Sequence, residues 1–421
     1  MKHAIVIGAG VVGSATALAL VERGLEVTLI ERNAEAGLET SHANGGGVTP
    51  AHSEPWNAPG LLGKLAGNLG RADAPYRLSP LALPGMGTWG LRFLANMRQR
   101  RFVENARRNI ALGMYSLERL RAWRERHGLE YRQTLSGSMQ VYFDERELDE
   151  SLELRRRLVG DRARIERLDA GAAIEREPAL EPVRDRLAGA IGFPDHESGD
   201  AAAFTRAVTE AAVRLGARLR FGETVEAIRI GRDGFEAVVT DRGSCRADAC
   251  VIAAGPESPR VARAAGLRLP IYPVRGYSAT FELAEPGAAP TLPMLDTSSR
   301  FVTLRLGERR LRVAGLADFA GHRRDIPADR IATLLAGARR LLPRLADELQ
   351  PERGELWAGL RPVTPDGVAL LGPTRVPGVH VNAGHGPMGW TMACGSAEII
   401  ADLIADRTPA IDTKPYCIRR S

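Results

Sequence analysis

Residues 4–13 read AIVIGAGVVG, and this stretch decides the fold. Residues 4–7 are an apolar run without polar alternation, which is typical of a central parallel strand buried on both faces. Residues 12–23 then follow a helical pattern, and residues 26–30 are strand-like after a break at Gly24. A strand, a glycine turn, a helix and a second strand in this order predict a βαβ unit.

The turn after the first strand has the spacing G-x-G-x-x-G, and the second strand is followed by an acid, Glu31. Gly8 permits the tight turn, Gly10 lets the backbone approach a pyrophosphate, and Gly13 lets the helix pack close to the sheet. The positive end of that helix then faces the phosphates, while Glu31 accepts the hydroxyls of an adenosine ribose. This unit therefore predicts a dinucleotide site with contacts from Gly8, Gly10, Val11, Val12, Gly13, Glu31 and Arg32.

A dinucleotide site of this kind holds NAD or FAD, and three later stretches favour FAD. Residues 222–228 predict an exposed strand whose backbone meets the adenine, and residues 248–255 predict a buried strand that passes beneath the cofactor. Residues 384–390 are a glycine-rich turn opening the last helix, whose N-terminus stabilises negative charge on a reduced flavin. The predicted contacts from the first two stretches are Val225, Ala254 and Gly255. An NAD-dependent dehydrogenase is the alternative.

The remaining pattern predicts an α/β protein in which a Rossmann-type FAD-binding domain is interrupted by a discontinuous second α+β substrate domain with an antiparallel sheet. Residues 271–283 and 300–314 alternate as a half-exposed antiparallel sheet would. Residues 131–143 and 218–230 are strand-like, and residues 145–180 are helical and charged. We expect a ligand in the cleft between the domains. The predicted boundaries are 1–85, 191–270 and 351–421 for the FAD-binding domain and 86–190 and 271–350 for the substrate domain.

The composition is that of an ordinary globular protein, with 57 Lys plus Arg against 51 Asp plus Glu in 421 residues. The net charge of +6 is compatible with a soluble enzyme or with attraction to an anionic substrate or membrane surface. The four cysteines form no C-x-x-C pair and no metal spacing, so we expect a reducing compartment and no metal. No signal peptide, membrane span or nucleic-acid motif is predicted, which favours a cytoplasmic location.

Residues 89–126 are rich in arginine and carry aromatic side chains beside the charges. Such a segment is compatible with a peripheral contact to anionic lipid at the inner face of the cell membrane, where electrons would pass to a quinone or another electron-transfer partner. It is equally compatible with a solvated helical face over the substrate domain, which we favour slightly.

Several further stretches carry a resemblance to a known family. They read ETS at 39–41 and ANGG at 43–46, PW at 55–56 with APG at 58–60, GD at 199–200, PVRGYS at 273–278, GLRP at 359–362 with TPDG at 364–367, and GHG at 384–386 with GWTMACGS at 389–396. In these segments the chain resembles the D-amino acid dehydrogenase (small subunit) family, within the broader group of D-amino acid oxidase and glycine oxidase flavoproteins. The matching segments span nearly the whole chain, and the last two are the most specific.

The resemblance implies FAD and a role for each matching stretch. Residues 40–47 would pack along the isoalloxazine and pyrophosphate, and residues 384–390 would line the pyrimidine edge. Arg361 would clamp the substrate carboxylate, a role that suits a bidentate guanidinium, and Tyr277 would add a hydroxyl donor. A domain-interface salt bridge for Arg361 and a core position for Tyr277 are the alternatives. The implied cofactor contacts are Thr40, Ser41, Asn44, Gly45, Gly46, Gly47, Gly359, Arg361, Gly384, His385, Gly386, Met388, Gly389, Trp390 and Thr391.

The chain departs from the family where many members carry a hydroxyl-bearing aromatic residue after Ser-Pro. Here the stretch is Thr49-Pro50-Ala51-His52, and this change is expected to alter the substrate pocket. The chain also ends soon after the last helix, without the family's longer tail. His52 and His385 are candidate catalytic residues, as a general base or as hydrogen-bonding wall residues. Hydride transfer needs only a neutral amine and alignment, which favours the wall role.

The sequence thus predicts oxidation of a small amino or imino acid by hydride transfer from Cα to flavin N5. For a D-amino acid, water completes the reaction to a 2-oxo acid and ammonia. A cyclic substrate such as D-proline or hydroxy-D-proline would give a cyclic imine instead. A non-catalytic flavin-binding subunit of a larger complex is a second alternative.

Overall fold

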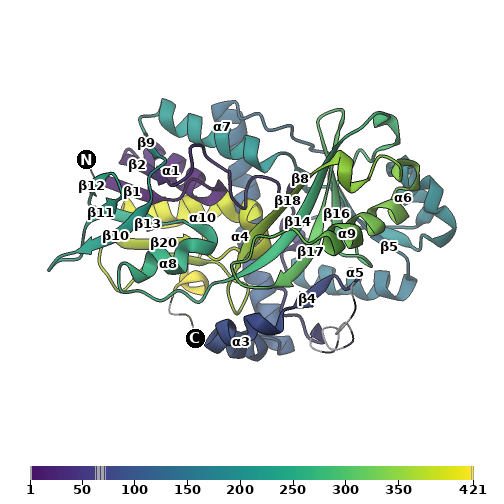
Figure 1. The fold of residues 1–421 in the computed structure, drawn as a ribbon, viewed down its shortest axis with the longest axis horizontal. Helices are drawn as coiled ribbons and strands as arrows, with labels where there is room; N and C mark the ends of the chain where they lie inside the picture. The colour runs from purple at the N-terminus through teal and green to yellow at the C-terminus, as the bar shows by residue number, and fades with distance from the viewer. Residues whose placement is uncertain are drawn as a thin grey trace.

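A computed structural model describes residues 2–61, 63, 67, 71, 73–418 and 420 of the chain. Two large sheets lie next to each other along the longest axis of the molecule (Figure 1). The first sheet contains the N-terminal strand, and the second carries the long strands of the middle and late parts of the chain.

The first sheet is parallel except at one edge, where β19 and β20 are antiparallel. The apolar run at the start of the chain forms its central strand, as predicted. Its strands in spatial order are β19 (Leu370–Pro373), β20 (Val379–Ala383), β13 (Ala249–Ile252), β1 (His3–Ile7), β2 (Glu26–Glu31) and β9 (Arg218–Phe221).

Both faces of this sheet are covered, because alternate residues of β1 enter different cores. Ala4 and Val6 pack among residues of helices, whereas Ile5 and Ile7 pack against a small antiparallel sheet and a short helix. The helices on the first face are α1 (Val11–Glu22), α7 (Ala201–Arg214) and α10 (Gly389–Ile404). The elements on the second face are β10 (Val225–Ile230), β11 (Phe235–Thr240), β12 (Gly243–Arg246) and α8 (Ser258–Arg263).

The second sheet is antiparallel, apart from the parallel pairs β15–β5 and β17–β4. The strand β4 (Tyr76–Leu78) pairs only with the end of β17. The other strands in spatial order are β18 (Gly354–Val363), β14 (Tyr272–Glu282), β17 (Arg310–Phe319), β16 (Phe301–Leu306), β15 (Met294–Asp296), β5 (Ser138–Tyr142), β7 (Gly189–Phe193) and β6 (Glu166–Leu168).

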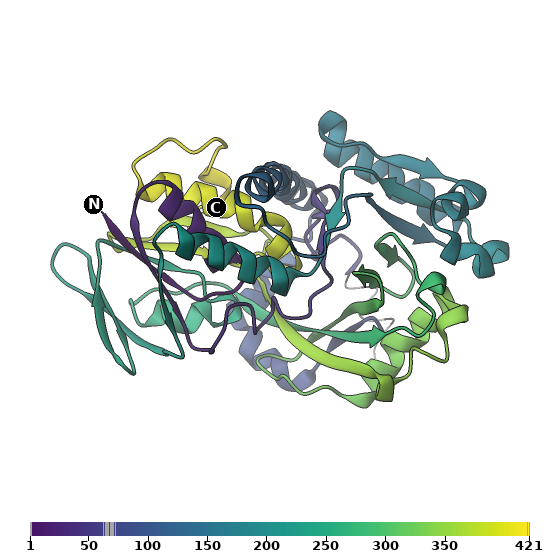
Figure 2. The ribbon, with the colours of Figure 1, turned by 90° about the horizontal axis from the view of Figure 1, so that it is seen from above.

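Helices surround the second sheet and connect it to the first. The long α4 (Gln99–His127) is seen nearly end-on between the two halves of the molecule in Figure 2 and packs on α10 and on α5 (Glu145–Val159). The other helices are α3 (Leu83–Ala95), α6 (Ala170–Arg176) and α9 (Ala328–Leu341). The strands β3 (Gly47–Val48) and β8 (Glu197–Ser198) pair in a small bridge, and η1 (Pro50–His52) is a single 3-10 turn.

The expectation that residues 271–283 and 300–314 form a half-exposed sheet is wrong. All but the last residue of β14, and all but the first of β17, are buried. One face packs under α9, and the opposite face meets the loop at residues 43–46, where the Ser278 hydroxyl donates to the Ala43 carbonyl at 2.7 Å. The polar side chains on these strands bond within the protein: Arg312 donates to the Thr280 hydroxyl at 2.9 Å and to the Asn44 carbonyl at 3.3 Å.

Three other expectations need correction. Residues 218–230 are two strands of different sheets, because the chain turns at Gly222, where φ is +68°. Only Ser138–Tyr142 is a strand within residues 131–143. Residues 145–180 are helical except for β6, which lies between α5 and α6.

The mixed α/β fold with one parallel and one antiparallel sheet agrees with the predicted fold class. The domain boundaries stay a prediction: β4 and β18 lie outside the predicted substrate-domain segments and pair with the second sheet. Among the described residues, no helix has the length and apolarity needed to cross a membrane.

Candidate active site

A cavity of about 1500 Å³ lies between the carboxyl ends of β1, β2 and β13 and one face of the second sheet. Among the predicted site residues, Gly13 and Thr391 do not line it. The predicted residues that do are Gly8, Gly10, Val11, Val12, Glu31, Arg32, Thr40, Ser41, Asn44, Gly45, Gly46, Gly47, His52, Val225, Ala254, Gly255, Tyr277, Gly359, Arg361, Gly384, His385, Gly386, Met388, Gly389 and Trp390.

The turn between β1 and α1 is built from glycines for steric reasons. Gly8 has a φ of +104°, and a Cβ there would lie 2.7 Å from the Ala253 carbonyl oxygen. A Cβ on Gly13 would collide with the carbonyl oxygen of Gly8, so Gly13 lies behind the cavity and holds α1 against the turn. Gly10 is the N-cap of α1 and supplies no capping side chain. The Val11 N–H donates to the Ser41 hydroxyl at 3.0 Å, and Gly10, Val11 and Val12 line the cavity, so the positive end of the helix faces it.

Two carboxylates shape the cavity near β2. Glu31 accepts hydrogen bonds from the backbone N–H groups of Ala9 at 2.8 Å and Asn33 at 2.9 Å, which fixes its orientation at the end of the strand. A carboxylate has lone pairs beyond those two bonds and can accept further hydroxyls. Arg32 forms an ion pair with Glu39.

The loop at residues 40–47 is held from both sides. Thr40 donates its hydroxyl to the Leu360 carbonyl at 2.7 Å, and the Gly46 carbonyl accepts from the Gly199 N–H at 2.9 Å. Gly46 has a φ of +63°, and a Cβ there would overlap the Leu304 side chain. Side chains in this loop would therefore displace it from the second sheet.

The turn before α10 forms the opposite wall. Gly384 has a φ of +80°, and a Cβ there would lie 2.6 Å from the Thr364 methyl group. His385 Nε2 lies 3.2 Å from the Ser396 hydroxyl, and burial lowers the pKa of His385 to about 4, so the ring is neutral at pH 7. The Thr391 hydroxyl accepts from the Thr49 N–H at 3.1 Å and thereby joins α10 to the loop before η1.

Trp390 supplies an unsatisfied donor at this wall. Its ring is buried against Tyr131 and Phe204, while its indole Nε1 is buried without a hydrogen-bond partner.

Arg361 is the most unusual cation of the cavity. Its Nη1 donates to the Leu316 carbonyl at 2.8 Å and its guanidinium lies 5.1 Å from the centre of the Trp56 ring, yet no carboxylate of the described residues pairs with it. Burial lowers the pKa of Arg361 to about 10, which leaves it charged at neutral pH. Gly276 makes room for the guanidinium, because a Cβ there would overlap it. The domain-interface salt bridge considered for Arg361 has no counterpart in this geometry.

Tyr277 lies in the same cavity wall, but its hydroxyl is engaged. It donates to Asp318 at 2.6 Å, and Asp318 also forms an ion pair with Arg330 at 2.8 Å. Burial and this hydrogen bond raise the pKa of Tyr277. The role of Tyr277 as a donor to a substrate anion therefore stays a prediction.

His52 belongs to a polar wall that sequence reasoning did not find. Its Nδ1 lies 2.5 Å from Nε2 of Gln140 on β5, and Gln140 in turn meets Arg155 and Tyr142. Arg155 forms an ion pair with Glu54. Burial, Arg155 and Arg300 hold the pKa of His52 well below its usual value. Gln140 and Arg155 carry no motif, because their positions on β5 and α5 matter only once the sheet has formed.

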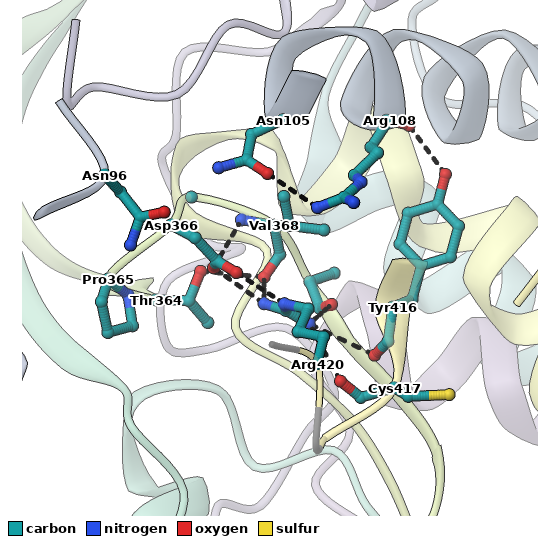
Figure 3. A network of polar contacts seen from close by, with 12 residues as sticks. Asn96, Asn105, Arg108, Thr364, Pro365, Asp366, Val368, Tyr416, Cys417 and Arg420 are labelled. Carbon is teal, nitrogen blue, oxygen red and sulfur yellow. Dashed lines mark hydrogen bonds and ion pairs between the residues drawn. The ribbon is translucent and has the colours of Figure 1, made fainter. Parts of the chain in front are cut away.

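Near the C-terminus, Arg420 and Asp366 belong to one network of polar contacts (Figure 3). Arg420 makes a bidentate contact with Asp366 at 2.6 and 2.8 Å and also donates to the Ala369 carbonyl. The loop that contains Asp366 also holds the segment with Trp56, because the neighbouring Asn57 donates to the Pro365 carbonyl at 2.9 Å. The chain segment after α10 is therefore connected to the cavity wall through the loop that contains Pro365 and Asp366.

Among the described residues, no group of three or more His, Cys, Asp or Glu side chains is placed to hold a metal ion. The start of α1 and the carboxylate of Glu31, which both line the cavity, instead suit an elongated dinucleotide.

Comparison with known proteins agrees with this geometry. The family model described as FAD dependent oxidoreductase (DAO) matches residues 3–403, and the chain therefore belongs to this family and binds FAD. A D-amino acid dehydrogenase from Paramagnetospirillum magneticum is 42% identical over 409 residues, which cover 97% of this chain and 96% of that protein. One from Sinorhizobium medicae is 38% identical over 416 residues, covering 99% of each.

Solved structures share the fold at low sequence identity. An L-proline dehydrogenase from P. horikoshii has a TM-score of 0.77 at 17% identity, covering 100% of this chain and 97% of that chain. A glycine oxidase from Geobacillus kaustophilus has a TM-score of 0.74 at 23% identity, covering 100% of both chains. These likenesses concern the fold alone.

Proposed function

We propose that this protein is an FAD-dependent dehydrogenase that deaminates D-amino acids oxidatively. The observation that carries the proposal is the guanidinium of Arg361, a cation in the cavity wall without a carboxylate partner. Removing a cation from water without a counter-ion is costly, so an anionic ligand is expected to complete the site. The relatives that are 36–42% identical are named D-amino acid dehydrogenase, which supports the D configuration.

The substrate carboxylate accepts two hydrogen bonds from Arg361 in this proposal. Trp56 stacks on the guanidinium and the Leu316 carbonyl holds Nη1, so the side chain is already oriented before a substrate binds. Binding a carboxylate would bring the pKa of Arg361 back toward its usual range. Tyr277 acts through Asp318, which stabilises the positive charge around Arg361.

FAD supplies the acceptor for the hydride that leaves the substrate Cα. The protein's share is alignment: Arg361 fixes the carboxylate, and the neutral amine loses a proton as the C=N bond forms. Water then adds to the imino acid, giving a 2-oxo acid and ammonia. His385 is neutral at pH 7 and hydrogen-bonds Ser396, so we assign it to the cavity wall.

The proposed cofactor contacts follow the cavity. The N-terminus of α1 would face the pyrophosphate, and Glu31 would accept the ribose hydroxyls. The turn at residues 384–390 and the N-terminus of α10 would lie at the flavin, where the positive end of the helix would stabilise negative charge. The loop at residues 40–47 would pack along the isoalloxazine and the pyrophosphate.

Turnover with an artificial electron acceptor tests this function. We expect D-alanine to release equal amounts of 2-oxo acid and ammonia while L-alanine is inert. Preference for the L isomer would contradict the proposal, and turnover restricted to D-proline without ammonia would favour the cyclic substrate class instead.

A second part of the proposal concerns the electron acceptor. We propose that the surface formed by the turn before α3 and by α3 itself rests on an anionic membrane and passes electrons to a quinone. This surface exposes four large apolar side chains within one short stretch, and exposed arginines follow it directly. The apolar residues are Leu81, Leu83, Leu91 and Leu94, and the arginines are Arg92, Arg98, Arg100 and Arg101.

The buried face of α3 belongs to a hydrophobic cluster that also contains Trp56 and Tyr76, two residues of the cavity wall. Trp89 packs against Tyr272 with ring centres 5.0 Å apart, and its indole N–H donates to the Val363 carbonyl at 3.0 Å. Co-sedimentation with vesicles of phosphatidylserine and phosphatidylcholine tests the contact. Binding should require phosphatidylserine and weaken as the salt concentration rises. It should fall in Leu91→Ser but not in the control Leu215→Ser, an exposed leucine directly after α7. Equal binding by both variants would contradict it.

A further inference from the structure

We propose that the wall formed by His52 and Glu54 selects D-amino acids whose side chain carries a carboxamide or a hydroxyl group. This inference rests on the proposed function and names its substrate class. It concerns the end of the stretch Thr49-Pro50-Ala51-His52, in which the chain departs from the family's hydroxyl-bearing aromatic residue.

The orientation of the Gln140 amide is fixed by its neighbours. Arg155 Nε lies 3.0 Å from Gln140 Oε1, and a guanidinium N–H can only donate. The Tyr142 hydroxyl donates to the same oxygen at 3.0 Å. Oε1 is therefore the acceptor side of the amide, and the NH₂ group points toward His52. Gln140 is 3% exposed, so water does not compete for these positions.

The amide in turn fixes the tautomer of His52. The Gln140 NH₂ group lies 2.5 Å from Nδ1 and can only donate, so Nδ1 must be the acceptor. The neutral ring then carries its hydrogen on Nε2. Protonation of Nδ1 would place two donors against each other, and burial together with Arg155 and Arg300 disfavours the imidazolium as well. His52 is thus a hydrogen-bond donor, not a base.

The donor at Nε2 has no partner within hydrogen-bond distance among the described residues. The nearest acceptor, Glu54 Oε2, lies 3.7 Å away, which is too long for a hydrogen bond. The other oxygen of Glu54 is occupied by Arg155. His52 and Glu54 both line the cavity. A donor and an acceptor side by side match a carboxamide, which accepts through its oxygen and donates through its nitrogen, or a hydroxyl, which does both.

His52 and Glu54 line the same cavity as Arg361. Leu316 accepts from Arg361 through its carbonyl and donates from its N–H to the Arg300 carbonyl at 3.4 Å. Arg300 is near enough to His52 to affect its protonation. Trp56, which stacks on Arg361, is four residues from His52 along the chain. A substrate held at Arg361 therefore has the His52 wall within reach of its side chain.

The test compares D-asparagine with D-leucine, which have similar shapes but differ in polarity. The wild-type protein should show a higher kcat/KM for D-asparagine. His52→Phe removes the donor and should lower the ratio of the two kcat/KM values about tenfold, the effect of one hydrogen bond. His52→Gln places an amide N–H near the former Nε2 and should retain the preference. His322→Phe, at an exposed histidine outside the cavity, is the matched control.

Each outcome separates this inference from the proposed function. If the wild-type protein oxidises no D-amino acid, the proposed function fails. If it oxidises D-leucine as fast as D-asparagine, only this inference fails. An equal loss in His52→Phe and His52→Gln, or disappearance of an acid limb from the pH profile for D-leucine, would show a structural or basic role. Faster turnover of D-aspartate than of D-asparagine would indicate that the substrate side chain binds the cation of Arg300, and would contradict the acceptor role of Glu54.

Discussion

The β1–α1 turn and the wall around Arg361 line one cavity but are built in different ways. The turn brings the backbone and the positive end of α1 to the cavity, and glycines permit this close packing by the absence of side chains. The wall offers side chains from separate elements: Arg361 comes from β18, Gln140 from β5 and Trp56 from the segment after η1. One short sequence motif is enough to form the turn, whereas the wall forms only when the strands of the second sheet have come together.

This difference also separates the two tasks. In the proposed arrangement the backbone of the first sheet binds the dinucleotide, so enzymes with different substrates can share that half of the fold. Substrate choice would then depend on the second sheet, where single side chains would hold the substrate's carboxylate and its side chain. Substitutions in the first region should therefore remove the cofactor, and substitutions in the second should change kinetics with the cofactor bound.

The largest effect is expected from Gly13→Ala. The new Cβ would collide with the Gly8 carbonyl, which is backbone and cannot rotate away. We expect protein purified without the flavin absorption band. Gly287→Ala is the control, because a Cβ there meets no atom within 4 Å. Full flavin content in Gly13→Ala would contradict the packing described for the turn.

Arg361→Met should retain FAD but lose activity. Two hydrogen bonds from a guanidinium to a carboxylate, each contributing about 1.5 kcal/mol or more, correspond to a loss of at least about 100-fold in kcat/KM for D-alanine. Arg361→Lys should recover little, because an ammonium lacks the planar fork. Flavin absorbance at purification serves as the control, and a loss below about fivefold would exclude the carboxylate role.

Arg420→Ala should destabilise the fold and disturb the wall indirectly. The largely buried Asp366 would lose its cation, a change that costs about 3 kcal/mol in comparable pairs. We expect a lower midpoint of urea unfolding and a raised KM for D-alanine with kcat nearly unchanged, since Asn57 and Trp56 depend on this loop. Arg146→Ala, at an exposed ion pair, should leave both measurements unchanged.

The smallest effect concerns pH. The folded-state pKa of His385 is about 4, below its ordinary value of 6.5, so the unfolded chain binds more protons between these values. Stability should therefore fall as the pH falls below 6.5, by about 2 kcal/mol from this residue between pH 7 and 5. His385→Gln should lose correspondingly less stability over that interval in urea titrations. An unchanged pH dependence would contradict the buried neutral ring.

The sequence predicted the first sheet and its turn because each residue there acts locally. Gly8 has a positive φ, Gly13 packs against the Gly8 carbonyl five residues before it, and the apolar run at 4–7 marks a buried strand by its composition alone. The antiparallel character of β14, β16 and β17 was also predicted. Their burial was not, because their second face is covered by the loop at residues 43–46, which is distant in sequence.

The polar wall could not be predicted for the same reason. Gln140, Arg155 and Glu54 come from three separate segments, and nothing in their local pattern marks them. Trp56 belongs to a motif shared with the family, yet its contact with Arg361 became visible only in the folded chain. The strands β7 and β15 were missed because glycine, proline and short length weaken the strand pattern.

An anaerobic visible titration of the purified protein tests the central claim most directly. The account predicts a flavin band that D-alanine bleaches, while L-alanine leaves it unchanged. It also predicts that D-alaninamide, which lacks the carboxylate that Arg361 would bind, bleaches the band far more slowly. Equal bleaching by D-alanine and D-alaninamide would contradict the role of Arg361, and a flavin band that no D-amino acid bleaches would contradict the proposed function.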